Sequence, residues 1–187
     1  MPAGSACETF VALRTEVQNW RWAGVPFYLR TGKRLAARDA QIVVNFREVP
    51  HPIFPGMNRP NQLVIKLQPE DGLELRLMAA KGSSPTGNSS HVGEVLAPVS
   101  LDLDFDKMFA TERVGAYERL LMDAIAGRLN LFVRSDEQEQ AWLWVEPILQ
   151  AWAREPNGPR PYAAGGWGPP AASALVARDG FVWAEEQ

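Results

Sequence analysis

A cluster of cationic side chains follows a short β-prone stretch early in the chain, and its residue types suit the binding of a phosphate group. The stretch ends at Gly32, with Arg30 just before it and Lys33, Arg34 and Arg38 after it. A residue without Cβ lets the backbone take positive φ or approach a ligand closely. Lys supplies a point charge and Arg a planar fork of donors, which together can hold a phosphate dianion. The alternative is a solvated strand end whose charges keep the sheet edge soluble.

The elements that carry this cluster belong to a first half with strand-like alternation. Apolar residues recur at every second position, the period of half-buried strands, in residues 9–17, 27–31, 42–46, 63–67, 73–77 and 99–105. Residues 69–72 have turn composition, so the strands on either side of them are expected to form an antiparallel hairpin. Residues 81–90 are rich in Gly, Ser, Pro and Asn, which is typical of a mobile loop.

The second half has helical periodicity. Residues 117–125 place apolar side chains at helical spacing before a stop at Gly127, and Ser135 with Gln138 has the spacing of a capping box. A further apolar stripe, predicted to be core facing the sheet, comprises Ala141, Trp144, Val145, Ile148, Leu149 and Trp152. Pro147 should kink this helix. Residues 155–170 read as coil and residues 171–178 as a last short helix.

Strands first and helices after predict an α+β fold, with a large, mainly antiparallel sheet and helices packed on one face. The other face would then be open to solvent or to a partner. Val43 and Val64 keep that second face partly apolar, which favours a partner subunit, with a solvated face as the alternative.

Composition bounds the class of protein. The chain has 187 residues, 46% of them hydrophobic and 22% charged, as expected for one globular domain over residues 1–187. A net charge of -3 gives no support for nucleic-acid binding. The lone Cys7, the absence of a signal-peptide pattern and the absence of a long apolar run predict a cytoplasmic protein outside the membrane.

Several runs of sequence closely resemble the C-terminal, substrate-binding domain of glucose-6-phosphate dehydrogenase. They occur in the family's order and span nearly the whole chain, at residues 20–35, 61–69, 116–121, 132–137 and 167–169. The resemblance implies a large antiparallel sheet that pairs with a second subunit. It also implies the family reaction, the NADP-dependent oxidation of glucose 6-phosphate to 6-phosphogluconolactone in the pentose phosphate pathway.

The resemblance assigns roles to individual residues. Lys33 and Arg38 match positions that contact the sugar phosphate, and Gln68 matches a third substrate contact. No residue here matches the family's catalytic histidine, because His51 and His91 lie in loop-like segments outside the family's motif. No catalytic residue and no metal ligand is therefore predicted in this sequence.

A second, structural NADP occurs in some members of the family. Arg30 and Lys66 match positions that hold it, and they are weak candidates for binding a cofactor here. The same site uses basic residues where this chain has Asp39, Val43 and Trp167. An acidic and two apolar replacements remove charge and donors that a 2′-phosphate requires, so we expect that the structural NADP does not bind.

The sequence therefore predicts a C-terminal domain of this family carried alone, from a truncated or split gene. Hydride transfer needs a base and a bound nicotinamide, and the sequence has neither that base nor a G-x-G-x-x-G turn. We expect the chain to be inactive alone, to bind glucose 6-phosphate weakly, and to pair with itself through the sheet or with a separate Rossmann-domain chain. The alternatives are a non-enzymatic sugar-phosphate-binding or oligomerisation module and an unrelated antiparallel-sheet interaction domain.

Overall fold

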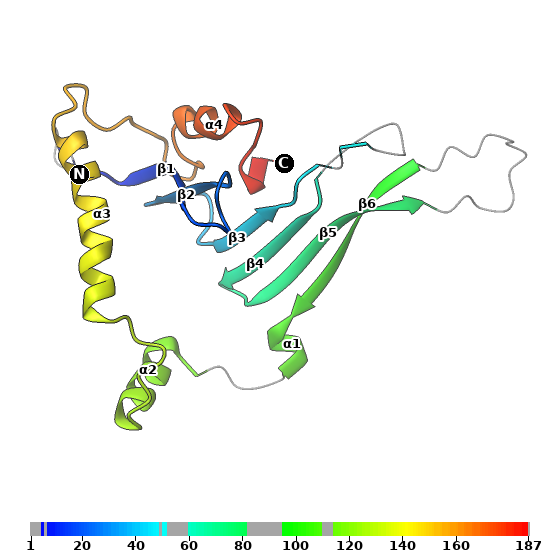
Figure 1. Cartoon of the computed structure of the whole chain (residues 1–187), viewed down its shortest axis with the longest axis horizontal. Coiled ribbons are helices and arrows are strands. Elements are labelled where there is room, and N and C mark those ends of the chain that lie inside the picture. Colours follow the sequence, from blue (N-terminus) through cyan, green and yellow to red (C-terminus); the bar gives the residue numbers. More distant parts are fainter. Residues whose placement is uncertain are drawn as a thin grey trace, which may run out of the picture. The chain divides into compact units, whose positions relative to one another are not determined.

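The chain forms two compact units, each with its own antiparallel sheet (Figure 1). The structure is a computed structural model, and it describes residues 5, 7–48, 50–51, 60–81, 95–109 and 114–186. The first unit comprises Met1–Ala37 and Glu112–Gln187, and the second comprises Arg38–Thr111. Most of the loop predicted at residues 81–90, and His91, lie outside the described residues, whereas Lys81 ends a strand.

The second unit is a four-stranded antiparallel sheet in the order β3-β4-β5-β6. Its strands are β3 (Ala40–Asn45), β4 (Gln62–Gln68), β5 (Gly72–Lys81) and β6 (Val95–Asp104). The β4–β5 hairpin that alternation predicted is confirmed, with Leu63 opposite Leu75. The strand predicted to reach Phe105 ends one residue earlier, because the Asp104 carboxylate accepts the Lys107 N–H at 3.1 Å and caps helix α1 (Phe105–Phe109).

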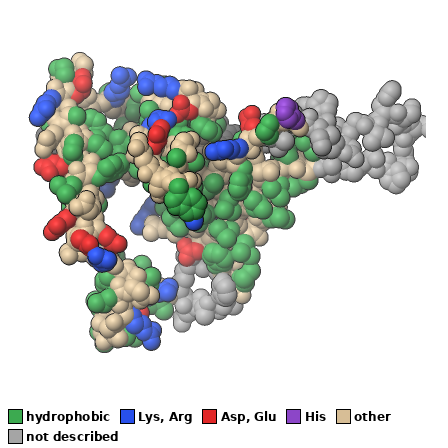
Figure 2. Space-filling model, viewed as in Figure 1, with side chains coloured by type: hydrophobic (Ala, Val, Ile, Leu, Met, Phe, Trp, Pro, Cys, Tyr) green, Lys and Arg blue, Asp and Glu red, His purple; other side chains and the backbone are tan. Residues whose placement is uncertain are grey.

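The two faces of this sheet differ sharply in chemistry. Cross-strand register places Val43 opposite Val64 on a face that also carries charged and amide side chains from all four strands. The opposite face is aliphatic, and Figure 2 shows hydrophobic side chains gathered over this sheet. We define the aliphatic face as Ile42, Val44, Leu63, Ile65, Leu67, Leu73, Leu75, Leu77, Val99, Leu101 and Leu103.

Val43 and Val64 were predicted to make the open face of the sheet partly apolar, but the exposed apolar surface lies on the opposite face. Val64 is 1% exposed, whereas Leu101 and Ile42 on the aliphatic face are 62% and 50% exposed. The reason is cross-strand pairing: it gathers the long polar side chains beside Val64 and leaves only aliphatic side chains on the other side.

The first unit contains a two-stranded antiparallel sheet and the longer helices. Helix α4 packs on β1, burying Ala172 and Val176, and it begins with Pro170 at its first position, as favoured at helix starts. The elements are β1 (Phe10–Glu16), β2 (Pro26–Gly32), α2 (Ala116–Ile125), α3 (Ser135–Ala153), α4 (Pro170–Ala177) and the 3₁₀ turn η1 (Ala184–Glu186). The α+β class with antiparallel sheets is confirmed.

Helix α3 differs in two respects from the sequence prediction. Its N-cap is Arg134, whose backbone N–H donates to the Glu137 carboxylate at 3.0 Å, so the capping contact lies one residue before the predicted Ser135–Gln138 pair. Its apolar stripe is not a buried core, since Trp144 is 47% exposed and α3 has no buried residue among those described. Helical spacing shows which side of a helix is apolar but does not say what covers it, and in this unit α4 packs on the sheet.

Candidate functional site

Within the predicted phosphate-binding stretch, the end of strand β2 is fixed by several hydrogen bonds from other segments. The Lys33 N–H donates to the Thr9 carbonyl oxygen at 2.8 Å. The Tyr162 hydroxyl lies 2.9 Å from that same oxygen and 2.6 Å from the Lys33 carbonyl oxygen. A phenol has one proton, so this is a hydrogen bond shared between two carbonyl groups. Arg34 follows with φ +53°, in the left-handed region, and turns the chain away from the strand.

Aromatic packing explains the glycines around this strand end. The Phe10 ring lies against Gly32 and Gly168, where a Cβ atom would approach it to 2.8 and 2.3 Å. Gly168 also has φ +111°, a conformation that side chains rarely allow. The Tyr162 ring packs on Phe10 with centroids 5.4 Å apart. Close packing at Gly32, rather than freedom to approach a ligand, is thus the role of this glycine in the structure.

Lys33 and Arg34 open onto a hollow of about 350 Å³, lined by Thr9, Lys33, Arg34, Tyr162 and Ala164. Both cationic side chains are exposed. Within the part of the chain that the structure describes, neither has an ion-pair partner. A cationic hollow without an internal counterion can accept an anion at little cost in broken contacts.

The other two predicted substrate contacts belong to the second unit. Gln68 pairs with Ala40 across β3 and β4, and Arg38 precedes Ala40 by two residues, so both lie at the same end of this strand pair. Both side chains are exposed. The three predicted contacts are therefore divided between the units, with Lys33 in the first and Arg38 and Gln68 in the second.

Arg30, one of the two candidates for the structural NADP, is engaged inside the first unit. Its guanidinium carbon lies 4.4 Å from the centroid of the Trp183 ring and 5.4 Å from that of Trp167. The guanidinium also forms an ion pair with Glu185, and the two side chains are only 10% and 15% exposed. Cation–π contacts and a carboxylate thus already satisfy the Arg30 charge.

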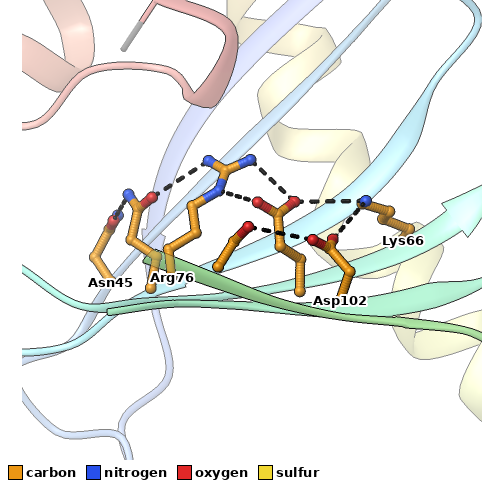
Figure 3. A network of polar contacts seen from close by, with 7 residues as sticks. Asn45, Lys66, Arg76 and Asp102 are labelled. Atoms are coloured by element: carbon orange, nitrogen blue, oxygen red, sulfur yellow. Dashed lines mark hydrogen bonds and ion pairs between the residues drawn. The ribbon is translucent and has the colours of Figure 1, made fainter. Parts of the chain in front are cut away.

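Lys66, the other candidate, belongs to a polar network that crosses all four strands (Figure 3). Its ammonium lies 3.5 Å from the Glu74 carboxylate and 3.6 Å from that of Asp102. Arg76 donates to Glu74 at 2.7 Å. This hydrogen bond, with the attraction of both cations, lowers the pKa of Glu74 below its ordinary value although burial opposes the shift.

The network continues from Arg76 toward the sheet edge at β3. Arg76 reaches the Gln62 side-chain oxygen at 3.4 Å, and the Gln62 amide donates to the Asn45 oxygen at 2.6 Å. Gln62 is only 6% exposed, so these contacts satisfy an almost buried amide. The cations on the face that carries Lys66 are therefore already paired with carboxylates and an amide of the same sheet.

A second group of polar contacts ties the C-terminal segment to β1 and β2. The Asp179 carboxylate accepts from Arg14 at 2.8 Å and from the Tyr28 hydroxyl. These two hydrogen bonds, that of Tyr28 foremost, lower the pKa of Asp179. The pKa of Tyr28 is raised, first by desolvation and then by its hydrogen bond to Asp179.

Sequence reasoning missed Tyr162, Trp183 and Glu185, which organise the surroundings of Lys33 and Arg30. All three lie in segments without periodicity, where a residue's position on a strand or helix face cannot be inferred. One available signal was composition, because aromatic residues in a Pro- and Gly-rich coil must find packing partners elsewhere in the chain. Across the described residues no group of three His, Cys, Asp or Glu side chains is placed to hold a metal ion.

Comparison with known proteins decides the family. Residues 1–184 match the family described as "Glucose-6-phosphate dehydrogenase, C-terminal domain". The chain belongs to this family. It is 48% identical over 182 residues to glucose-6-phosphate 1-dehydrogenase of Rhizobium meliloti, covering 96% of this chain and 36% of that protein. It is equally similar to the enzyme of Mycolicibacterium smegmatis, with 96% and 35% covered.

Solved structures of glucose-6-phosphate dehydrogenase have the same fold. The crystal structure of the Mycobacterium avium enzyme superposes with a TM-score of 0.75 at 37% identity, covering 97% of this chain and 36% of that one. A glucose-6-phosphate dehydrogenase in complex with its substrate glucose-6-phosphate superposes with a TM-score of 0.81 at 29% identity, covering 98% and 37%. The chain thus spans about a third of the length of the relatives it matches. In the described residues no helix is long and apolar enough to cross a bilayer.

Proposed function

We propose that this chain is the part of a glucose-6-phosphate dehydrogenase that binds the sugar phosphate, with Lys33 as the principal contact. The observation that carries the proposal is the Lys33 ammonium, exposed beside a hollow on a strand end that is fixed at both its N–H and its carbonyl group. Charge-assisted hydrogen bonds to a phosphate dianion are the interactions that this arrangement offers. We further propose that residues 1–187 are one domain, and that Arg38 and Gln68, in the second unit, are also substrate contacts.

The reaction proposed for the complete enzyme is NADP-dependent oxidation of glucose 6-phosphate in the cytoplasm. It requires a nicotinamide held against the sugar and a base for the hydroxyl proton. We assign both to a Rossmann domain, in the same protein or in a separate chain. The 187-residue polypeptide by itself then binds the substrate and performs no hydride transfer.

The structural NADP of some family members does not fit this chain. Arg30 makes cation–π contacts with Trp167 and Trp183 and an ion pair with Glu185, and Lys66 is paired with Glu74 and Asp102. Binding a 2′-phosphate would break these contacts, and leaving a half-buried carboxylate without its cation is costly. We therefore assign no cofactor to Arg30 or Lys66.

Self-association through the aliphatic face is the second part of the proposal. The face is aliphatic on all four strands, and Leu101 and Ile42 on it are at least half exposed. Monomeric proteins seldom leave a contiguous apolar surface of this kind in water. The same observation favours the alternative function, a non-enzymatic oligomerisation module that keeps the sheet and a sugar-phosphate-binding strand end.

A titration followed by amide NMR shifts tests the proposal. Glucose 6-phosphate should shift the amides of Lys33 and Arg34 with a millimolar dissociation constant, about -4 kcal/mol, since only part of the substrate pocket is present. Glucose without its phosphate serves as the matched ligand control and should leave these amides unchanged. Lys33→Ala should weaken the shifts and raise the dissociation constant while the variant stays folded. Shifts confined to another surface, or unchanged binding by Lys33→Ala, would refute Lys33 as the contact.

A further inference from the structure

We propose that Tyr162 is a positioning residue for Lys33, acting through the backbone of the strand end rather than by touching the substrate. The inference rests on the proposed function, because it names the residue that holds the principal phosphate contact in place. Tyr162 lies 129 residues from Lys33 along the chain, and its hydroxyl meets the Lys33 carbonyl oxygen at 2.6 Å.

The hydroxyl of Tyr162 is used entirely on the backbone. Its proton is shared by the carbonyl oxygens of Thr9 and Lys33, and Thr9 also accepts the Lys33 N–H at 2.8 Å. Both polar groups of the Lys33 backbone therefore converge on one phenol and one carbonyl group. Rotation of the Lys33 peptide would lose several of these hydrogen bonds together, which restricts where its side chain can begin.

The ring that presents this hydroxyl is itself fixed. Tyr162 packs against Phe10, and Phe10 is seated against Gly32 and Gly168, where no Cβ could fit without displacing its ring. The hydroxyl thus links the strand end that carries Lys33 to a packed aromatic cluster whose position is fixed. Because the backbone of Lys33 is already ordered in the ligand-free chain, binding a phosphate restricts only the rotamers of its side chain, which lowers the entropic cost of binding.

Two further backbone hydrogen bonds join the segment after Tyr162 to the segment after Lys33. The Gly165 N–H donates to the Arg34 carbonyl oxygen at 2.9 Å, and the Ala36 N–H donates to the Gly166 carbonyl oxygen at 3.1 Å. These bonds hold the turn that has Arg34 in the left-handed region. Tyr162 is the only side chain among those described that bonds directly to the Lys33 backbone, so it is the residue to test.

The test compares the parent chain with Tyr162→Phe, which removes one oxygen atom and keeps the ring. In the ligand-free state, the Lys33 amide should exchange with solvent about tenfold faster, because its acceptor and its own carbonyl lose a shared donor. With glucose 6-phosphate as the probe, the dissociation constant measured at Lys33 should rise about three- to tenfold, the equivalent of one net hydrogen bond. Tyr28→Phe is the matched control. It removes a hydroxyl from β2, the strand that ends just before Lys33, but this hydroxyl bonds to Asp179 and not to the Lys33 backbone.

A double-mutant cycle separates positioning from a general loss of stability. Adding Tyr162→Phe to a Lys33→Ala chain should leave the residual affinity for glucose 6-phosphate unchanged, whereas its effect on thermal unfolding should persist. The inference is overturned if Tyr162→Phe binds and exchanges as the parent does, or if it weakens binding equally in the Lys33→Ala background. If the parent shows no binding at Lys33, it is the proposed function that fails. The positioning role is then still tested by amide exchange in the ligand-free chain, and an unaltered exchange rate of the Lys33 amide in Tyr162→Phe would overturn it.

Discussion

Self-association through the aliphatic face can be tested at Leu101. Its side chain is the most exposed large hydrophobic on that face, at 62%, and its neighbours across β5 and β6 are aliphatic. Leu101→Lys places a charge on the aliphatic face, on the edge strand β6, without changing the polar network on the other side of the sheet. We expect the parent chain to dimerise and the variant to be monomeric.

The magnitude follows from the exposed fraction. Fully burying a Leu side chain is worth about 1.5–3 kcal/mol, so covering the exposed 62% contributes about 1–2 kcal/mol in each subunit. In a symmetric dimer the same residue counts twice, so losing both copies removes about 2–4 kcal/mol. The dissociation constant should therefore rise about 30-fold to 700-fold, and the desolvation of two Lys side chains adds to this.

Sedimentation velocity or light scattering over a dilution series measures this change. Leu121→Lys is the matched control, because Leu121 is 65% exposed on helix α2 in the other unit. It should leave the association of the parent intact. The reasoning is refuted if the parent stays monomeric at high concentration, or if Leu121→Lys disrupts assembly as strongly as Leu101→Lys does.

Three further expectations follow from the structure. The purified 187-residue chain should form no NADPH from glucose 6-phosphate and NADP, and turnover near the roughly 10 s⁻¹ typical of enzymes would contradict its assignment as the substrate-binding part. Because the folded-state pKa of Glu74 is lowered, its ion pairs with Arg76 and Lys66 stabilise the fold above its ordinary pKa of about 4.3 and fail as pH falls through the lowered value. Glu74→Gln should therefore cost about 1 kcal/mol at pH 7 in chemical unfolding and flatten this acid dependence, whereas the control Glu118→Gln on α2 should cost less at pH 7. Trp183→Ala should lower the free energy of unfolding by about 2–4 kcal/mol, because it removes a packed ring and its cation–π contact with Arg30. As the control, Trp20→Ala should change the free energy of unfolding by less than about 0.5 kcal/mol, since Trp20 is 88% exposed. Equal effects of the two substitutions would show that the contact between Trp183 and Arg30 does not stabilise the unit.

Much of the local structure could be predicted from the sequence because it depends on neighbouring residues. Alternation located all six strands of the described residues, and helical spacing with Gly127 located α2. The Pro-initiated α4 was likewise predicted within a residue or so at each end. These signals are short-range, since a strand or helix face repeats every two or about 3.6 residues. The family resemblance, carried by ordered runs of residues, was also available from the sequence and is confirmed.

Tertiary structure alone decided how the faces and the strand end are used. Periodicity separates two sides of the four-stranded sheet, but only cross-strand register gathers Lys66, Glu74 and Asp102 on one side and leaves Leu101 open on the other. The same holds for α3, whose apolar stripe was visible in the sequence although its exposure was not.

The surroundings of the two cationic candidates depend on contacts between distant segments. Tyr162 meets Lys33 across 129 residues, and Trp183 covers Arg30 from the C-terminal end of the chain. Residue type marked both cations as possible phosphate ligands, because Lys and Arg carry the same charge wherever they stand. Whether that charge is available depends on which acids and aromatic rings the fold brings beside it: Arg30 has Glu185 and two Trp rings, whereas the ammonium of Lys33 has no carboxylate partner among the described residues.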